Sequence, residues 1–326
     1  MGLIHSKDKQ IYINFNCRHS YKKKIGPEIR ANCLVTLQKN VMNISISGAG
    51  GFIGTALSRA FQARGWTVKP ISRGSLSLPD DEFRQSRIEG SDVVINLAGA
   101  SISKKWNKEY KDEILSSRLD TTRKIVTAIT RSVQKPGLLI SASAVDIYDN
   151  SGTHDDESTS FAGSFLGKVC LEWEQEALKV SADCRLVITR MGLVLGDNGG
   201  ALDKMHLPFS LGLGAVVGKG DQWISFIHIK DLVNAFIFII ENPSVQGPVN
   251  VVSPYPVTNR DFSKTLGKVL KQPVFLSVPS GLMTRLYGEG ASVLLEGRKV
   301  LPGKLTEAGF HFTYPTITNS LVNLFG

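Results

Sequence analysis

The feature that most constrains the fold of this chain is a glycine-rich segment, Gly48-Ala-Gly-Gly-Phe-Ile-Gly54, which separates two different hydrophobic patterns. Residues 43–47 before it form a short strand-like run, and residues 52–64 after it carry apolar side chains on one helical stripe. Gly48 allows a tight turn, Gly51 lets the backbone approach a pyrophosphate, and Gly54 permits close packing of helix on strand. The segment predicts a dinucleotide-binding turn at a helix N-terminus, with Ala49, Phe52 and Ile53 as further cofactor-side residues.

Strand and helix patterns alternate through the rest of the first 253 residues. Strands are expected at residues 66–72, 92–97, 138–143, 185–189 and 249–252, and a long helix at 108–130. This alternation predicts an α/β fold with a Rossmann-type doubly wound parallel sheet. Prolines punctuate short elements after residue 254, which indicates a smaller C-terminal α+β lobe on the substrate side. The expected division is 1–41, an extension; 42–253, the Rossmann domain with part of the substrate lobe inserted near 197–230; and 254–326, the lobe.

The end of the second predicted strand discriminates between cofactors. An NAD-binding protein places Asp or Glu there for the ribose 2′-hydroxyl, whereas this chain has Ser72 and Arg73 and no acid before Asp80. A guanidinium pairs well with a 2′-phosphate through charge-assisted hydrogen bonds. The segment therefore favours NADP(H), although a solvated surface arginine would give the same pattern.

Charge and cysteine content limit the other function classes. The net charge is +9, but residues 1–41 alone contribute +6, so the folded part gives little support to nucleic-acid binding. No apolar run is long enough to span a bilayer, and the four cysteines form no CxxC pair or Cys/His cluster. We expect no metal site and no membrane or nucleic-acid partner.

Residues 1–41 are either a targeting segment, a disordered tail or sequence upstream of a natural start at Met42. The expected location is cytoplasmic, or organellar if these residues are a transit peptide.

Further motifs resemble the extended short-chain dehydrogenase/reductase superfamily, in an atypical form. Asn96-Leu-Ala-Gly99, Ser141-Ala-Ser143 and the segment from Gly218 to Asp231 match its signatures. A narrower resemblance, covering residue 43 to the end, is to the YfcH-like epimerase family with its DUF1731-type C-terminal lobe. Its motifs here are Trp106, Ser117-Arg118, Trp173-Glu174, Arg190–Gly196, Gly199–Ala201, Pro208–Gly214, Gln222-Trp223, Leu295–Pro302 and Ala308–Phe310.

The resemblance implies more cofactor-side residues. The backbone of Leu97, Ala98 and Gly99 would lie against the cofactor, and Val194 falls in a matched segment. Glu113 and Arg118, on the long helix that flanks the cofactor in such relatives, become candidates by the same match. Two solvated helix charges would explain Glu113 and Arg118 nearly as well.

The catalytic residues depart from the superfamily pattern. The resemblance places the catalytic serine at Ser143 and the lysine of a Tyr-x-x-x-Lys motif at Lys168, but Ser164 occupies the tyrosine position. A serine hydroxyl is too weakly acidic and too short to replace a phenol. Tyr148 is either a substitute or a packing aromatic, and the position of His228 is usually structural. The proton donor stays unassigned.

Trp223 stands where nucleotide-sugar members often have an arginine, which argues against a nucleotide sugar as ligand. The first hypothesis is an NADP(H)-dependent oxidoreductase or epimerase-like enzyme acting on an unidentified small molecule, as a monomer or homodimer. The alternative is a catalytically weak NADP(H)-binding regulatory protein, similar to proteins labelled cell-division-inhibitor-like. The missing tyrosine favours the second hypothesis, and the retained Ser143 and Lys168 favour the first.

Overall fold

The centre of the structure is a sheet of six parallel strands. A computed structural model describes residues 41–197 and 199–326, and the expectations for residues 1–40 lie outside them. The strands lie in the order β11-β6-β4-β3-β1-β2, and every neighbouring pair is parallel. Their bounds are β1 (Asn43–Ser47), β2 (Thr67–Ile71), β3 (Val93–Asn96), β4 (Leu138–Ala144), β6 (Arg185–Met191) and β11 (Gly247–Val251). The predicted Rossmann-type sheet is confirmed.

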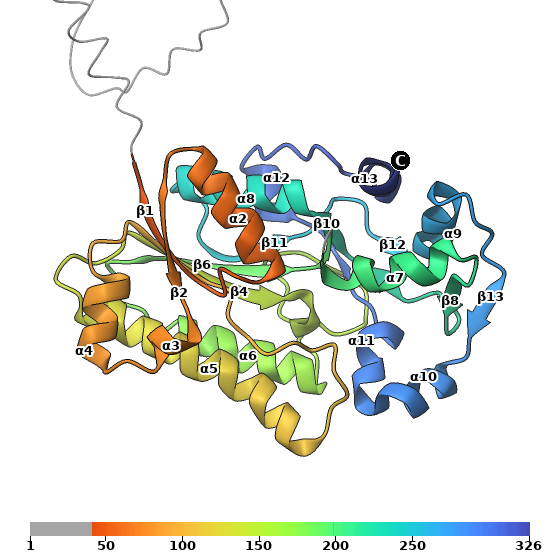
Figure 1. The fold of residues 1–326 in the computed structure, drawn as a ribbon, viewed down its shortest axis with the longest axis horizontal. Coiled ribbons are helices and arrows are strands. Elements are labelled where there is room, and N and C mark those ends of the chain that lie inside the picture. The colour runs from red at the N-terminus through yellow and green to blue at the C-terminus, as the bar shows by residue number, and fades with distance from the viewer. Residues whose placement is uncertain (1–40, 198) are drawn as a thin grey trace, which may run out of the picture. The chain divides into compact units, whose positions relative to one another are not determined.

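Helices cover both faces of this sheet (Figure 1). On one side lie α2 (Phe52–Ala63) and α8 (Ile229–Glu241), and on the other lie α5 (Lys108–Arg131) and α6 (Phe165–Ala177). Alternate residues of each strand supply the two cores: Val93 and Ile95 pack with α2 and α8, while Val94 packs with α5. Because both faces are covered, the central strand β3 is buried along its whole length, whereas the edge strand β2 is mostly exposed or half-buried.

The connection between β2 and β3 lacks a strand. It consists of α3 (Arg73–Leu76), α4 (Asp80–Phe83) and one π-helical turn, η1 (Arg84–Ile88). Phe83 and Ile88 are buried against α5, so the connection closes the core without adding a strand. Residues 74–90 are too few for a further strand and its helix, so β2 is the edge of the sheet.

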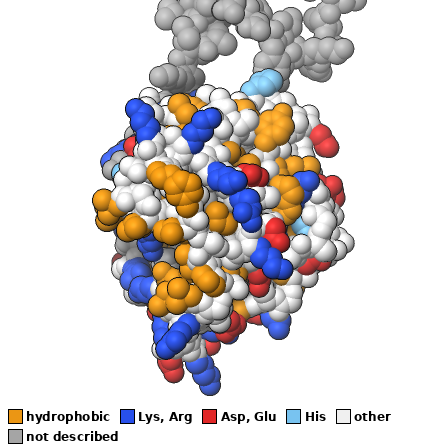
Figure 2. Space-filling model, turned by 90° about the vertical axis from the view of Figure 1, so that its right-hand side faces the viewer, with side chains coloured by type: hydrophobic (Ala, Val, Ile, Leu, Met, Phe, Trp, Pro, Cys, Tyr) orange, Lys and Arg blue, Asp and Glu red, His pale blue; other side chains and the backbone are white. Residues whose placement is uncertain are grey.

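A second group of elements forms a lobe beside the carboxyl end of the sheet. Three two-stranded sheets lie here: β7 (Leu193–Leu195) with β10 (Phe226–His228), β8 (Ala215–Val217) with β13 (Leu276–Val278), and β9 (Trp223–Ile224) with β12 (Val257–Thr258). The helical elements are α7 (Gly200–Ser210), α9 (Asn259–Val269), α10 (Ser280–Tyr287), η3 (Gly288–Ala291) and α11 (Ser292–Leu295). Leu202, Phe209, Phe262 and Leu266 give the lobe its own apolar core. On the face shown in Figure 2, hydrophobic side chains lie among lysines and arginines. Phe275, just before β13, is 88 % exposed.

The chain then returns to the central sheet. Strand β14 (Lys299–Val300) pairs with β5 (Thr153–His154), α12 (Gly303–Glu307) packs against β11, and α13 (Ile317–Phe325) ends the chain. Asp231 on α8 is buried and accepts hydrogen bonds from the backbone N–H groups of Thr313 (2.9 Å) and Tyr314 (2.8 Å). The predicted boundary at residues 253/254 stays a prediction. No helix within residues 41–197 and 199–326 could cross a bilayer.

Candidate functional site

The glycine-rich segment forms a tight cradle at the start of α2. Gly48 has a φ of +72°, and its carbonyl oxygen accepts a hydrogen bond from the Gly51 N–H at 3.0 Å. A Cβ on Gly54 would lie 2.2 Å from the same oxygen, so a larger residue cannot pack there. No side chain caps the helix at Gly51. The first N–H groups of α2 are therefore available to an anion, as a dinucleotide phosphate requires.

The opposite wall of the cradle is the backbone that follows β3. The Ser47 hydroxyl accepts from the N–H groups of Leu97 (3.1 Å) and Ala98 (3.2 Å) and donates to the Asn96 amide oxygen (2.6 Å). The Asn96 amide nitrogen and the Trp173 indole both donate to the Thr122 hydroxyl at 2.8 Å. This buried polar chain runs from β1 through α5 to α6. It fixes both helices relative to the backbone against which the resemblance places the cofactor.

Arg118 on α5 reaches into this wall. A Cβ on Gly99 would lie 2.9 Å from the Arg118 guanidinium carbon, and the guanidinium stacks on the Trp173 ring with 5.3 Å to its centroid. One of its nitrogens donates to the Ile114 carbonyl at 2.8 Å. Among the described residues no carboxylate pairs with it. Burial lowers the pKa of this guanidinium. A largely buried cation without a protein counter-ion suits a bound anion, whereas Glu113 is exposed on the same helix.

The end of β2 presents Arg73 to solvent. Ser72 caps α3 by accepting from the Ser75 N–H, and Arg73 is the exposed first residue of that helix. Asp80, the nearest acid along the chain, turns towards α5 and lies 3.5 Å from the Lys124 ammonium. The position that an acid would occupy in an NAD site is thus held by a hydroxyl and a guanidinium.

The remaining cofactor-side candidates are apolar. Ala49, Ile53, Leu97 and Val194 are partly buried and pack against the main core. The Phe52 ring is enclosed by a glycine-rich loop: Cβ atoms on Gly196 or Gly199 would lie 2.7 and 2.8 Å from it. The cradle is therefore supported from below by the sheet core and from the side by the loop after β7.

A buried ion pair lies beneath Ser143, at the carboxyl end of β4. The Ser143 hydroxyl donates to Glu174 at 2.6 Å, and Arg190 donates to both oxygens of that carboxylate, at 2.9 and 2.8 Å. Burial lowers the pKa of Arg190, the hydrogen bonds with Glu174 raise it, and the net change is upward. The proton of Ser143 is therefore directed into the core.

Tyr148 belongs to the same buried assembly. Its ring is 0 % exposed, and its hydroxyl accepts from Arg190 and contacts the Asn250 amide oxygen and the Asp155 carbonyl, all at 2.8 Å. Burial raises the pKa of the Tyr148 phenol, although Arg190 opposes the shift. The packing interpretation of Tyr148 fits this geometry, because its proton is engaged inside the protein.

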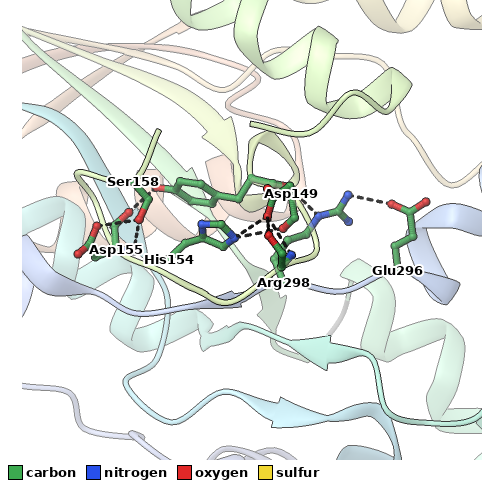
Figure 3. A network of polar contacts seen from close by, with 8 residues as sticks. Asp149, His154, Asp155, Ser158, Glu296 and Arg298 are labelled. Atoms are coloured by element: carbon green, nitrogen blue, oxygen red, sulfur yellow. Dashed lines mark hydrogen bonds and ion pairs between the residues drawn. The ribbon is translucent and has the colours of Figure 1, made fainter. Parts of the chain in front are cut away.

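A second cluster joins the lobe to the end of β4 (Figure 3). The turn η2 (Val145–Ile147) carries Asp146, which lies 3.3 Å from Arg298. Arg298 also contacts Glu296 at 2.9 Å and donates to the Tyr148 carbonyl at 3.0 Å. Beside it, His154 stacks on the Tyr148 ring and lies 3.3 Å from Asp149. Two carboxylates thus share one buried guanidinium.

A surface cavity of about 420 Å³ opens where the N-terminal ends of α5 and α6 meet η3. The Trp106 and Phe165 rings form its apolar wall in an edge-to-face contact with 5.4 Å between centroids. Lys111 and Glu289 form an ion pair of 2.8 Å across it. Its lining residues are Trp106, Asn107, Lys108, Lys111, Asp112, Phe165 and Glu289.

A profile of the NAD dependent epimerase/dehydratase family matches residues 44–253, nearly two thirds of the chain. A second profile, a domain of unknown function called DUF1731, matches residues 278–324. The chain belongs to the NAD dependent epimerase/dehydratase family. The expected family, including its C-terminal lobe, is thereby confirmed.

Relatives within this family are similar over nearly the whole length. Epimerase family protein SDR39U1 of the mouse is 38 % identical over 288 residues, 86 % of this chain and 98 % of the relative. The chloroplastic SDR39U1 homolog of Arabidopsis thaliana is 37 % identical over 301 residues, 87 % of each chain. The crystal structure of human SDR39U1 with NADPH superimposes with a TM-score of 0.82 at 34 % identity, covering 87 % of this chain and 99 % of that one.

Against the family's Tyr-x-x-x-Lys arrangement, the start of α6 differs. The Ser164 hydroxyl caps the helix by accepting from the Gly167 N–H at 3.3 Å. Lys168 is exposed on α6, and within the part of the chain that the structure describes its ammonium group forms no hydrogen bond or ion pair. The catalytic assignment of Ser143, Ser164 and Lys168 stays a prediction.

His228 has a structural environment. Its Nδ1 accepts from the Lys230 N–H at 3.1 Å, its ring contacts Tyr314, and burial lowers its pKa to about 4.

Sequence patterns did not reveal Ser47, Thr122 and Asp146, because each of these side chains contacts a partner that is distant in sequence. The signal for Ser47 was its place directly before the glycine-rich turn.

Proposed function

We propose that this protein is an NADP(H)-dependent oxidoreductase or epimerase-like enzyme acting on a small molecule. The observation that carries the proposal is Arg118, a largely buried guanidinium beside Gly99 that has no carboxylate partner among the described residues. It lies against the backbone wall that faces the Gly48–Gly54 cradle. A dinucleotide diphosphate would satisfy this cation and the free N–H groups of α2 together. The human relative solved with NADPH supports the same assignment.

The choice of NADP(H) over NAD(H) rests on Arg73. In the proposed complex its guanidinium holds the 2′-phosphate, and Asp80 does not compete for the ribose because it faces Lys124. When bound, the cofactor supplies hydride chemistry, and the protein supplies position and electrostatics. The residues of this chain contribute the cradle, two cations and the polar chain from Ser47 to Trp173.

The substrate pocket in this proposal is the cavity between α5, α6 and η3, walled by Trp106 and Phe165. Trp223, where nucleotide-sugar members often have an arginine, carries the Lys299 ammonium over its ring at 4.7 Å. Because a tryptophan stands where an arginine would contact a diphosphate, we infer a substrate that is flatter or less charged than a nucleotide sugar. The regulatory alternative gains no support from the similar proteins.

Fluorescence titrations with NADPH and NADH test the proposal. The wild-type protein is expected to bind NADPH more tightly, and Arg73→Ala should weaken NADPH binding by about 10- to 100-fold while leaving NADH binding unchanged, since a hydrogen bond to a charged group contributes about 1.5–3 kcal/mol. Arg118→Ala should weaken both. The control is Arg131→Ala, an exposed arginine at the opposite end of α5. Equal binding of both cofactors that neither variant changes would refute the proposal.

For the compartment we propose the cytoplasm, or an organelle if residues 1–41 direct import. The Arabidopsis relative is named as chloroplastic. Imaging a fluorescent protein fused behind residues 1–41, against one fused behind no extension, separates the two locations.

A further inference from the structure

An apolar surface on the lobe is built from two segments that are distant in sequence. The short parallel sheet of β8 and β13 pairs Ala215 with Leu276, so the residues directly before them in the two segments are neighbours. A Cβ on Gly212 would lie 3.2 Å from the Gln272 side chain, which agrees with that register. We call the exposed apolar side chains at this place the apolar edge; its members are Leu207, Leu211, Leu213, Phe275 and Leu276.

The side chains of the apolar edge project from the protein rather than line a groove. Phe275 is 88 % exposed, Leu207 and Leu211 are each 65 % exposed, and Leu213 is 61 % exposed. Single exposed apolar side chains are ordinary on a protein surface, but several that lie together commonly mark an interaction site. The apolar edge is therefore a candidate surface for a partner that takes up protruding apolar groups.

The segment that carries Phe275 also carries the positive charge of the folded part. Residues 259–288 contain five Lys or Arg and one Asp, a net charge of +4. The chain carries +9, of which residues 1–41 carry +6, so residues 42–326 carry +3 and their part outside 259–288 carries −1. Arg260, Lys264 and Lys268 recur at every fourth residue along α9, and all three side chains are exposed. An anionic partner would be attracted to this segment before any other in residues 42–326.

The basic face of α9 and the apolar edge belong to adjoining elements. The Ser263 hydroxyl on α9 donates to the Ala215 carbonyl on β8 at 3.3 Å. Among residues 41–197 and 199–326, no carboxylate lies within ion-pair distance of Lys264, Lys268 or Lys271. Helix α9 and strands β8 and β13 lie at the right of Figure 1, the side that faces the viewer in Figure 2. Unpaired cations and protruding apolar side chains thus share one face of the lobe.

We propose that this face of the lobe binds the surface of an anionic lipid bilayer. The apolar edge enters the boundary between headgroups and acyl chains, and the lysines and arginines beside it contact the charged headgroups. The expectation of no membrane partner rested on the length of apolar runs, and a peripheral contact needs no run of that length. The inference is independent of the proposed function, because none of these side chains lines the cavity at Trp106 or the glycine-rich cradle.

Charge and shape favour a bilayer over two other partners. A second copy of this chain that met the same face about a two-fold axis would bring the two basic faces of α9 together, and like charges repel. A protein partner commonly seats its apolar anchors in a pocket or lays a helix in a groove. The Phe275 ring stands out from the surface instead, and a bilayer accepts such a side chain without a matching pocket.

Flotation of the full-length protein with lipid vesicles measures the contact. Vesicles of phosphatidylcholine and phosphatidylserine in equal parts should carry the wild-type protein, and vesicles of phosphatidylcholine alone should carry much less. Phe275→Ser should weaken binding to the mixed vesicles by about 10- to 100-fold, because one apolar side chain no longer leaves water. Lys268→Ala and Lys271→Ala should each weaken it by about fivefold, and added salt should weaken it further.

Matched changes at the amino end of the central sheet are the controls. Val133, in the connection between α5 and β4, is 90 % exposed, so Val133→Ser removes an apolar side chain from water as Phe275→Ser does. Arg131→Ala removes an exposed cation from the end of α5. Both variants should bind the mixed vesicles as the wild type does. Every protein tested keeps residues 1–41, so any attraction of that basic segment to lipid is the same in all samples.

A tryptophan placed in the apolar edge measures insertion directly. Phe275→Trp keeps an aromatic side chain and should bind the mixed vesicles like the wild type. Its emission should be quenched by phosphatidylcholine that is brominated on its acyl chains, beyond the quenching seen in the wild type. The control is Val133→Trp, whose added emission should not be quenched.

Several results would overturn the proposal. They are a wild-type protein that does not bind the mixed vesicles, undiminished binding by Phe275→Ser and by both lysine variants, and a Phe275→Trp emission that brominated lipid does not quench. Without vesicle binding, an acidic protein would become the better candidate for this face. Sedimentation equilibrium without lipid tests the second copy: a wild-type dimer that Phe275→Ser converts to a monomer would assign the face to self-association instead.

Discussion

Removal of the Glu174 carboxylate should destabilise the protein more than almost any other single change at the site. Glu174 is 6 % exposed and accepts from Arg190 twice and from Ser143 once. In Glu174→Ala the Arg190 side chain, which is 5 % exposed, stays buried, and of the partners of its guanidinium within the described residues only the Tyr148 hydroxyl remains. An uncompensated buried charge costs about 3–5 kcal/mol. At an unfolding entropy of about 2.1 cal/mol/K per residue, such a loss lowers the Tm of a 326-residue chain by about 4–7 °C.

Urea denaturation and differential scanning calorimetry measure the effect. Glu174→Gln, which keeps the hydrogen-bonding shape but not the charge, should fall between Glu174→Ala and wild type. The control is Glu172→Ala, two residues earlier on the exposed face of α6, with a change below about 0.5 kcal/mol. The reasoning is refuted if Glu174→Ala unfolds within 1 kcal/mol of wild type, since the ion pair would then contribute no more than an exposed one.

Three further predictions follow from contacts of the site. Gly54→Ala should lose NADPH binding and about 1–3 kcal/mol of stability, because its Cβ would lie 2.2 Å from a backbone oxygen. The control is Gly163→Ala, which has open space around it and should change neither property. Fluorescence titration measures the binding, and thermal unfolding measures the stability. Trp173→Phe removes the indole donor to Thr122 and should lower the free energy of unfolding by about 1 kcal/mol, measured by urea denaturation. A urea midpoint equal to that of the wild type would contradict this prediction. The pKa of His228 is lowered to about 4 from 6.5 in the unfolded chain, so the folded state binds fewer protons and stability should fall by about 3 kcal/mol as pH falls from 6.5 to 4. His228→Asn, which preserves the helix cap, should reduce this slope, and an identical slope in both proteins would contradict the assignment.

Local patterns in the sequence predicted the central sheet and its helices closely. The expected helix at 108–130 is α5 (Lys108–Arg131), and the expected strand at 92–97 is β3 (Val93–Asn96). These elements could be predicted because strand and helix impose different periods on apolar residues, and because glycines mark their ends. Gly65, at a φ of +82°, follows the C-cap residue Arg64 of α2, the place where a glycine commonly ends a helix.

Pairings between distant segments could not be predicted in this way. Asp146 and Arg298 are 152 residues apart, and Ser47 and Asn96 are 49 apart, so no periodicity connects them. The candidate residues Gly48, Gly51 and Gly54 were found because a backbone turn leaves a local signature. The surroundings of Ser143 and Lys168 depend instead on how α6 packs, and that is decided by tertiary contacts.

Residues 305–314 complete the main core beside the central sheet. Leu305 and Phe310, only 21 and 16 positions from the C-terminus, are buried among side chains of β1 and α2, and Asp231 binds the backbone at residues 313 and 314. During synthesis the apolar core of the Rossmann half therefore stays partly uncovered until residues 305–314 have been made. A premature stop before residue 305 would leave that apolar surface uncovered, so such truncated products should aggregate or be degraded.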